Sequence, residues 1–531
     1  MRSTPFNLAA QAAAGGGPRR SLSRVAVVAA FVAVGAVLLP LAAGAASGRA
    51  PGGVRAGLGL GLIQPVLSAV EALGRARALP LAFAFAGVGV GAACGFILAP
   101  FYHVRAVRFF AVAVRSIHEL FWALVLMQVA GIGVVAGVVA IALPYTGIFA
   151  KVFSEYLEET DRRPREALPP ATSALSGFLY TRLPLAWREL KTYTLYRMEC
   201  GVRSSAVLGF IGLPTLGFQL DSAFKMGQYG AVGAILLIYF LTIGSIRVWL
   251  RRRLVPLFLL GSALLLARVE TPPMAGGALW RFLTEDIIPA PLRRGDIAEM
   301  QTWGRFADWA LELFADQAFP GLVAPVVVAQ LALVATGVVA ILGFALIVPR
   351  IVGRWGALAG HIGLVIGRSS PEYMLAYVLL QIFGPSMLPA VLALGLHNGA
   401  IIGHLLGRQA NGLAENLRQD APRGLNLYAY EMVPRLFAPF LALCLYRWEI
   451  IMRESAILGM LGVATLGYHI DAAISELRMD RVMFFLLTTL AATLAVDALS
   501  RAIRRRLGKS ALRLENADQQ CGLKGASGVS N

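Results

Sequence analysis

The sequence predicts an all-α membrane protein made of two parallel repeats, each with about six transmembrane helices. The chain of 531 residues is 57% hydrophobic and only 15% charged, with a mean hydropathy of +0.67, whereas a soluble chain carries about a quarter charged residues. Leu195–Ala223 and Leu445–Ala473 align without a gap and are identical at 15 of 29 positions. Such a match indicates an internal duplication.

Apolar runs long enough to span a bilayer recur along the chain, at Val25–Ala45, Ala324–Val348 and Val482–Val496. The first run is longer than the core of a signal peptide, and we expect it to remain as an anchor. A net charge of +18 can indicate binding to nucleic acid. The arginine clusters stand at the ends of apolar segments, however, and the positive-inside rule accounts for them there.

The basic residues also predict the orientation of the two halves. Arg19, Arg20 and Arg24 precede the first span, and Arg251–Arg253 and Arg504–Arg506 follow the last span of each half. Both termini are therefore expected in the cytoplasm. Each half then crosses the membrane an even number of times, so the halves are parallel rather than inverted copies.

The predicted units are residues 1–253 and 254–507, followed by a polar tail at 508–531. The crossings of the first unit are expected near residues 25–45, 79–101, 117–130, 133–153, 187–212 and 230–250. Those of the second are expected near residues 254–268, 322–349, 371–384, 388–407, 437–462 and 482–500. An outer connection between Glu270 and Pro320 contains apolar residues at helical spacing over Phe306–Phe314, which predicts an amphipathic helix.

Each repeat carries charged residues in its fifth crossing. Glu199 stands four residues before Arg203, and Glu449 stands four residues before Arg453, which is the favourable order for an ion pair along a helix. One interpretation is that each pair neutralises itself within the membrane. The other is that these side chains face the transport pathway, because ionisable residues at membrane depth usually face a partner or a pore.

Arg197 and Arg447 point about 160° away from these glutamates on a helix of 100° per residue. Glu119 and Glu372, at the start of the third crossing of each half, are candidate counter-ions. Alternatively, the two arginines face the pathway, where a guanidinium offers planar donors that match phosphate or phosphonate oxygens. A lipid headgroup is a third candidate partner.

Several motifs occur in the same order in both halves. A segment beginning Arg-Ser, as at Arg115–Leu120, comes first, followed by a polar loop that ends in Leu-Pro or Val-Pro. The pattern LYRxE…RxSxxLGxxGxxTLG and a final RRRL complete the order. Together they resemble the phosphonate-type ABC importer permeases, which have the type I (binding-protein-dependent) transmembrane fold. The resemblance covers about residues 79–254 and 322–507, so the chain resembles two permease units fused head to tail.

This resemblance implies a permease subunit that moves phosphonate or phosphate-like oxyanions, phosphite included, across the bacterial inner membrane. It also implies two separate ATPase subunits and a periplasmic substrate-binding protein as partners. The ATPase subunits would dock on the polar loops between the fourth and fifth crossings. Glu166, Ala167 and Pro184 retain part of the family's docking pattern in the first loop, and Glu415 and Pro434 retain less of it in the second.

The resemblance further implies an outer gate at Gly212–Gly217 and Gly462–Gly467, whose end glycines occupy equivalent positions in the two halves. An ordinary tight turn before the next helix is the alternative interpretation. Asp221 and Asp471 follow, and each either pairs with a partner protein or caps a helix.

Nothing in the sequence indicates catalysis, a cofactor or a metal site. Leu507–Ser510 ends like a phosphate-binding P-loop, but Ile503 stands where its first glycine belongs. Two other functions remain as alternatives to an ABC permease. One is a secondary anion transporter driven by an ion gradient, and the other is a membrane enzyme that acts on phospholipid headgroups.

Overall fold

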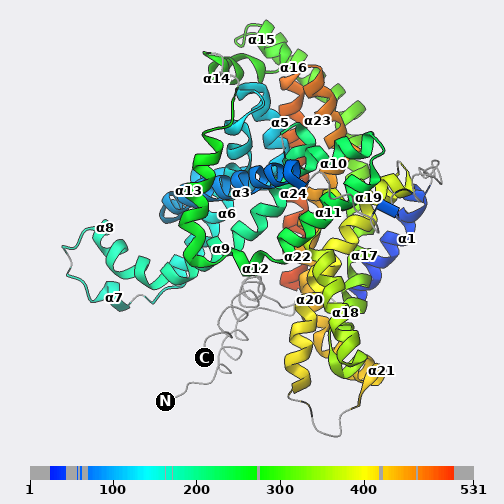
Figure 1. The fold of residues 1–531 in the computed structure, drawn as a ribbon. Helices are drawn as coiled ribbons and strands as arrows, with labels where there is room; N and C mark the ends of the chain where they lie inside the picture. Colours follow the sequence, from blue (N-terminus) through cyan, green and yellow to red (C-terminus); the bar gives the residue numbers. More distant parts are fainter. Residues whose placement is uncertain are drawn as a thin grey trace.

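A computed structural model shows the fold (Figure 1) and describes residues 24–43, 57, 60–61, 70–161, 163–169, 171–213, 215–271, 276–384, 386–415, 417, 422–461 and 465–506. The regular elements in these ranges are all helices, which confirms the all-α class. Gly462 of the predicted outer gate and the tail 508–531 lie outside the described residues.

The first half consists of eight longer helices and several single turns. The longer helices are α1 (Arg24–Ala43), α3 (Val70–Leu98), α4 (Arg105–Ser116), α5 (Glu119–Ala130), α6 (Val134–Glu159), α9 (Leu183–Val207), α10 (Leu216–Lys225) and α11 (Tyr229–Gly244). The short elements are η3 (Ala99–Phe101), α7 (Arg163–Glu166), α8 (Ala174–Gly177), η4 (Phe178–Arg182), η5 (Leu208–Ile211), α12 (Ile246–Trp249) and η6 (Arg252–Leu254).

The second half repeats this order after a different beginning. Its longer helices are α13 (Val255–Leu266), α16 (Met300–Leu313), α17 (Phe319–Ala345), α18 (Pro349–Ser369), α19 (Glu372–Phe383), α20 (Leu388–Glu415), α22 (Val433–Ile457), α23 (Leu466–Ser475) and α24 (Met479–Arg506). Its short elements are α14 (Ala278–Arg281), η7 (Phe282–Asp286), α15 (Ala290–Arg294), η8 (Phe314–Ala318), α21 (Gly424–Asn426), η9 (Leu427–Met432) and η10 (Leu458–Leu461).

The duplicated sequence forms duplicated structure. α9 and α22 begin and end at positions 250 residues apart, and so do α10 and α23. α5 and α19 begin 253 residues apart, at Glu119 and Glu372. A short π-helical turn, η4 or η9, precedes α9 and α22 in both halves. The two copies therefore share an architecture from α3 or α17 to the last long helix.

Within the described residues, five helices are long and apolar enough to cross a membrane, and the bent pair α4–α5 adds a sixth if it is one span. α9 and α22 have 25 residues each, which gives a length of about 37 Å, but they carry several charges. The chain is thus a multi-pass membrane protein, and the count of six crossings per unit stays a prediction.

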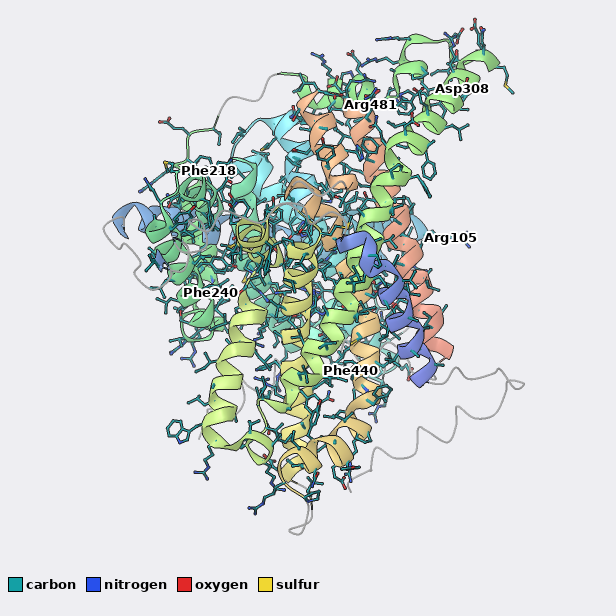
Figure 2. The ribbon with its side chains drawn as sticks, turned by 90° about the vertical axis from the view of Figure 1, so that its right-hand side faces the viewer. Arg105, Phe218, Phe240, Asp308, Phe440 and Arg481 are labelled. Carbon is teal, nitrogen blue, oxygen red and sulfur yellow. The ribbon has the colours of Figure 1, made fainter. Side chains whose placement is uncertain are left out.

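The connection between the halves projects beyond the other helices. α16, η8 and α17 form one continuous helix of 46 residues, Met300–Ala345, whose length of about 69 Å exceeds the ~30 Å thickness of a hydrocarbon core. Figure 1 shows α14, α15 and α16 at one end of the molecule, and Figure 2 shows Asp308 of α16 there. The amphipathic helix predicted over Phe306–Phe314 lies within α16 and η8.

Glycines bring the central helices of each half into close contact. In the first half the glycines lie on α3, and in the second half they lie on α20. They are Gly87, Gly91 and Gly95 on α3 and Gly395, Gly399, Gly403 and Gly407 on α20. A Cβ at Gly91 would lie 2.8 Å from the Tyr145 Cβ on α6, and one at Gly399 would lie 2.5 Å from the Val339 Cβ on α17. Small residues at four-residue spacing permit this approach in a membrane.

The first helix of each half packs on the other half. α1 lies against α17, where the Gln330 side chain donates a hydrogen bond to the Phe31 carbonyl at 3.0 Å. The rings of Phe31 and Trp448 of α22 meet edge to face at 4.9 Å. α13 lies against α3, with Phe258 stacked on Phe85 at 5.2 Å. The chain boundary near residue 253 therefore does not separate two independent packing units.

The close approach of α3 to α6 predicts that Gly91→Val destabilises the protein, because the added side chain must push α6 aside. Overpacking of this kind costs about 1–3 kcal/mol. Thermal unfolding of the detergent-solubilised chain measures the effect. Gly261→Val is the matched control, since Gly261 is a helical glycine with no atom within 4 Å of its added Cβ. Equal melting temperatures for the two variants would contradict the proposed packing role.

Candidate functional site

A polar cavity of about 190 Å³ lies between the two halves. It is lined by the beginnings of α5 and α19, the middle of α6 and α20, and the charged segments of α9 and α22. Among the described residues, its ionisable side chains other than tyrosine and cysteine are four arginines, three glutamates and two histidines. They are Arg197, Arg203, Arg447, Arg453, Glu119, Glu372, Glu454, His118 and His397.

Most of these side chains come in equivalent pairs from the two repeats. Arg197 corresponds to Arg447 and Arg203 to Arg453, each at an offset of 250 residues. Glu119 and Glu372 correspond at an offset of 253 residues. A cavity lined by both members of each pair lies where the two repeats meet, so each half supplies one side of it.

Arg203 and Arg453 join the halves by a reciprocal pair of hydrogen bonds. The Arg203 Nη1 donates to the carbonyl of Arg368 at 2.9 Å, and the Arg453 Nη1 donates to the carbonyl of Arg115 at 2.8 Å. Arg115 and Arg368 lie in the last turns of α4 and α18, where the helix breaks before α5 or α19. Among the described residues, neither arginine is within ion-pair distance of the glutamate four residues before it.

The helix breaks explain why arginines are needed there. The bend between α4 and α5 is 97°, and the last carbonyls of a helix have no intrahelical partner. Inside a membrane no bulk water satisfies them. A cationic donor at the carboxyl end of a helix also complements the helix dipole. Each half therefore supplies the donor for a carbonyl at the helix break of the other half.

The glutamates that begin α5 and α19 lie beside histidines. The His118 Nε2 is 3.6 Å from the Glu119 carboxylate, and the His397 Nε2 is 3.8 Å from the Glu372 carboxylate. His118 also accepts a hydrogen bond from the Leu120 backbone N–H, which caps α5. An acidic residue in the first turn complements the helix dipole. The position at the beginning of a helix and the neighbouring histidine thus explain why a glutamate is stable at each of these two places.

The guanidinium group of Arg197 contacts tyrosine side chains rather than a carboxylate. Its Nε donates to the Tyr193 hydroxyl at 2.7 Å, and its guanidinium lies 5.0 Å from the Tyr193 ring centre and 5.6 Å from that of Tyr196. Within the described part of the chain, no carboxylate lies within ion-pair distance of Arg197 or Arg447. Cation–π contacts hold a guanidinium in place without cancelling its charge, so Arg197 keeps its positive charge at the cavity.

Other residues predicted for the site lie outside the cavity lining. Glu199 and Glu449 are half-buried on α9 and α22. The predicted docking residues are exposed at the far ends of their helices or in the loops, namely Glu166, Ala167, Pro184, Glu415 and Pro434. The structure leaves their roles as predictions.

Of the predicted outer gate, three glycines are described. Gly212 adopts a φ of +92°, a backbone conformation that favours glycine. A Cβ at Gly467 would lie 2.2 Å from the Ala456 carbonyl oxygen, and Gly217 is buried. Near this region Asp221 accepts a hydrogen bond from the Tyr377 hydroxyl of the other half at 2.8 Å.

Sequence reasoning missed the third glutamate and both histidines of the cavity, namely Glu454, His118 and His397. Glu454 breaks the repeat, because Ser204 stands at its equivalent position in the first half. His397 likewise replaces Pro144. Aligned positions of the two repeats that differ in polarity were the signal that could have identified both. His118 directly precedes the predicted Glu119.

Comparison with known proteins shows similarity to transport permeases. The chain is 25% identical over 412 residues to the phosphate-import permease protein of Mycolicibacterium smegmatis, covering 74% of this chain and 76% of that protein. It is 33% identical over 127 residues to the phosphite transport system permease protein of Stutzerimonas stutzeri, covering 24% and 46%.

A third relative is described as a cryptic phosphonate transport system permease protein of Escherichia coli K12. The chain is 33% identical to it over 117 residues, which is 22% of this chain and 94% of that protein. No family model matches the sequence, and no solved structure matches the chain.

The reciprocal hydrogen bonds predict that Arg203→Gln and Arg453→Gln each destabilise the association of the halves. A hydrogen bond to a charged group contributes about 1.5–3 kcal/mol, and a carbonyl left unpaired within the membrane adds to the loss. Thermal unfolding in detergent measures the effect, with Arg188→Gln, an exposed position on α9, as the control. A melting temperature unchanged from that of the control would exclude the bridging role.

Proposed function

This chain belongs to the phosphonate transport permease family, and from that premise we propose that it is the fused transmembrane subunit of an ABC importer for phosphonate or phosphate-like oxyanions. One observation carries the proposal, namely the cavity between the halves with Arg197 and Arg447 free of carboxylate partners among the described residues. Its substrate pathway passes through that cavity. Nothing in the comparisons favours a gradient-driven transporter.

The charges of the cavity fit an anion that must bind and then leave. Guanidinium groups offer paired donors to phosphate or phosphonate oxygens. Three glutamates stand against the four arginines, so the local positive charge is limited. A site in a transport pathway must bind the anion favourably enough for it to enter and weakly enough for it to be released. The arrangement therefore suits transient binding during transport better than tight binding.

The two polar loops are the proposed docking sites for two ATPase subunits. The first loop carries α7 and α8, with Glu166 and Ala167, and the second loop precedes α21. Figure 1 shows α7 and α8 at one edge of the molecule and α21 at another, so that each half presents its own loop. Pro184 and Pro434 stand at the beginnings of α9 and α22. Movement of a docked ATPase would thus be transmitted directly to the cavity-lining helices.

The remaining parts of the proposal concern topology. Residues 1–253 and 254–507 form the two permease units, with about six crossings each. Both termini and both loops face the cytoplasm, and the protein lies in the bacterial inner membrane. The opposite side, with Gly212, Gly217, Gly467 and the projecting helix α16, faces a periplasmic binding protein that delivers the substrate.

Removing the free charges is expected to weaken anion binding. For the chain in lipid nanodiscs, we expect Arg197→Gln combined with Arg447→Gln to lower the affinity for radiolabelled inorganic phosphate by about tenfold or more, since each charged hydrogen bond contributes about 1.5–3 kcal/mol. Arg188→Gln is the control, and thermal unfolding is measured to check that the double variant is folded. An unchanged affinity would overturn the proposed role of these arginines.

Energy coupling is tested separately by purification of the chain from its native membrane. We expect two ATPase subunits per chain, because each half presents one polar loop, and the subunit ratio follows from native mass spectrometry. ATP hydrolysis by the complex should rise when the substrate-loaded binding protein is added. A chain that purifies alone and moves phosphate in liposomes on an ion gradient would contradict the proposal.

A further inference from the structure

The cavity is symmetric in its arginines but not in its acids. Glu454 stands at the position that Ser204 occupies in the first half, and both residues line the cavity. Asn398 stands at the position of Tyr145, and His397 at that of Pro144. The second half therefore presents a carboxylate with a polar neighbour where the first half presents a hydroxyl and a phenol.

The Glu454 carboxylate is held in place on one side. Its residue is only 8% exposed, and the Asn398 Nδ2 donates to its Oε2 at 3.3 Å. The same amide nitrogen donates to the Leu394 carbonyl at 3.1 Å, which ties Asn398 to its own helix. Among the described residues, the other carboxylate oxygen, Oε1, accepts no hydrogen bond. Glu454 thus lines the cavity with an acceptor oxygen that none of the described residues uses.

The neighbouring cation does not neutralise Glu454 through a direct ion pair. Arg453 precedes it in sequence, but its guanidinium donates across the interface to the Arg115 carbonyl at 2.8 Å. Within the described residues, no basic side chain is within ion-pair distance of Glu454. An anion that enters this cavity therefore meets a carboxylate as well as the guanidinium groups of Arg197 and Arg447.

A carboxylate and an oxyanion can share a site only when a proton lies between them. An ionised carboxylate only accepts hydrogen bonds, and two like charges in contact exclude each other unless one is protonated. Phosphate and phosphonate anions carry an exchangeable P–O–H near neutral pH, and this group can donate to a carboxylate oxygen. Sulfate is fully ionised there and brings no such proton.

We infer that Glu454, acting as an ionised carboxylate, makes the pathway selective for oxyanions that bring their own proton, such as hydrogen phosphate and monoprotonated phosphonates, over fully ionised sulfate. The inference rests on the proposed function, since it concerns the same cavity. Glu454 acts against the wrong anion through repulsion, which is how specificity is commonly achieved between ligands of similar shape. The permease would then add a filter of its own to that of a binding protein.

The test compares anion selectivity of the full chain in lipid nanodiscs. Bound radiolabelled phosphate is displaced by unlabelled methylphosphonate or by sulfate, and the ratio of the two inhibition constants is measured. In Glu454→Gln the amide can still accept from Asn398 and can donate to an oxyanion. We expect sulfate to compete about tenfold better in this variant relative to methylphosphonate, with phosphate binding retained.

Glu454→Ser, which reproduces the residue of the first half, is the second variant and is expected to shift the ratio in the same direction. Glu312→Gln removes an exposed acidic charge on α16 and should leave the ratio unchanged. A selectivity ratio that stays at the wild-type value in the folded Glu454 variants would overturn the inference alone. If wild-type protein binds neither phosphate nor methylphosphonate, the proposed anion site itself fails, and the inference fails with it.

Discussion

The structure depends on one constraint, which is that the last backbone carbonyls of an interrupted helix need a donor from elsewhere in a chain that spans a membrane. Each half contains such a break, before α5 and before α19. Arg203 and Arg453 satisfy the break of the opposite half rather than that of their own. The two halves are therefore obliged to meet at this depth, and the polar cavity lies at their meeting point.

The same constraint separates two kinds of arginine. The guanidinium groups of Arg203 and Arg453 donate hydrogen bonds to backbone carbonyls of the opposite half, so they stabilise the interface between the halves. Arg197 has a neutral partner in Tyr193, which fixes its direction and leaves its charge available. Two guanidinium groups that stand six residues apart on one helix thus have different roles in the proposed function: Arg203 joins the halves, and Arg197 binds the anion.

The repeat, the helical class and the charged segments could be predicted from the sequence, because local periodicity and the offset of 250 residues report them directly. The ion pair suggested for Glu199 and Arg203 relied on helix spacing alone, whereas the structure gives Arg203 a partner 165 residues away. No local pattern encodes such a contact. The bend before α5 was also missed, and so was the packing of α1 and α13 on the opposite half, because both depend on tertiary structure. Glu454 was visible only as a difference between copies.

The first helix of each half packs on the opposite half, and this has a consequence for how the helices assemble during synthesis. α13 follows the first half after only a few residues, so it can cover α3 almost as soon as that half is complete. α1 is made first, yet its packing surface on α17 does not exist until Phe319 and the residues after it have been synthesised. At ~5–20 residues per second, the chain between Ala43 and Phe319 takes on the order of 15–60 s to emerge. During that interval α1 is exposed to lipid without α17. Its uninterrupted apolar sequence keeps it stable in the bilayer until α17 has been inserted.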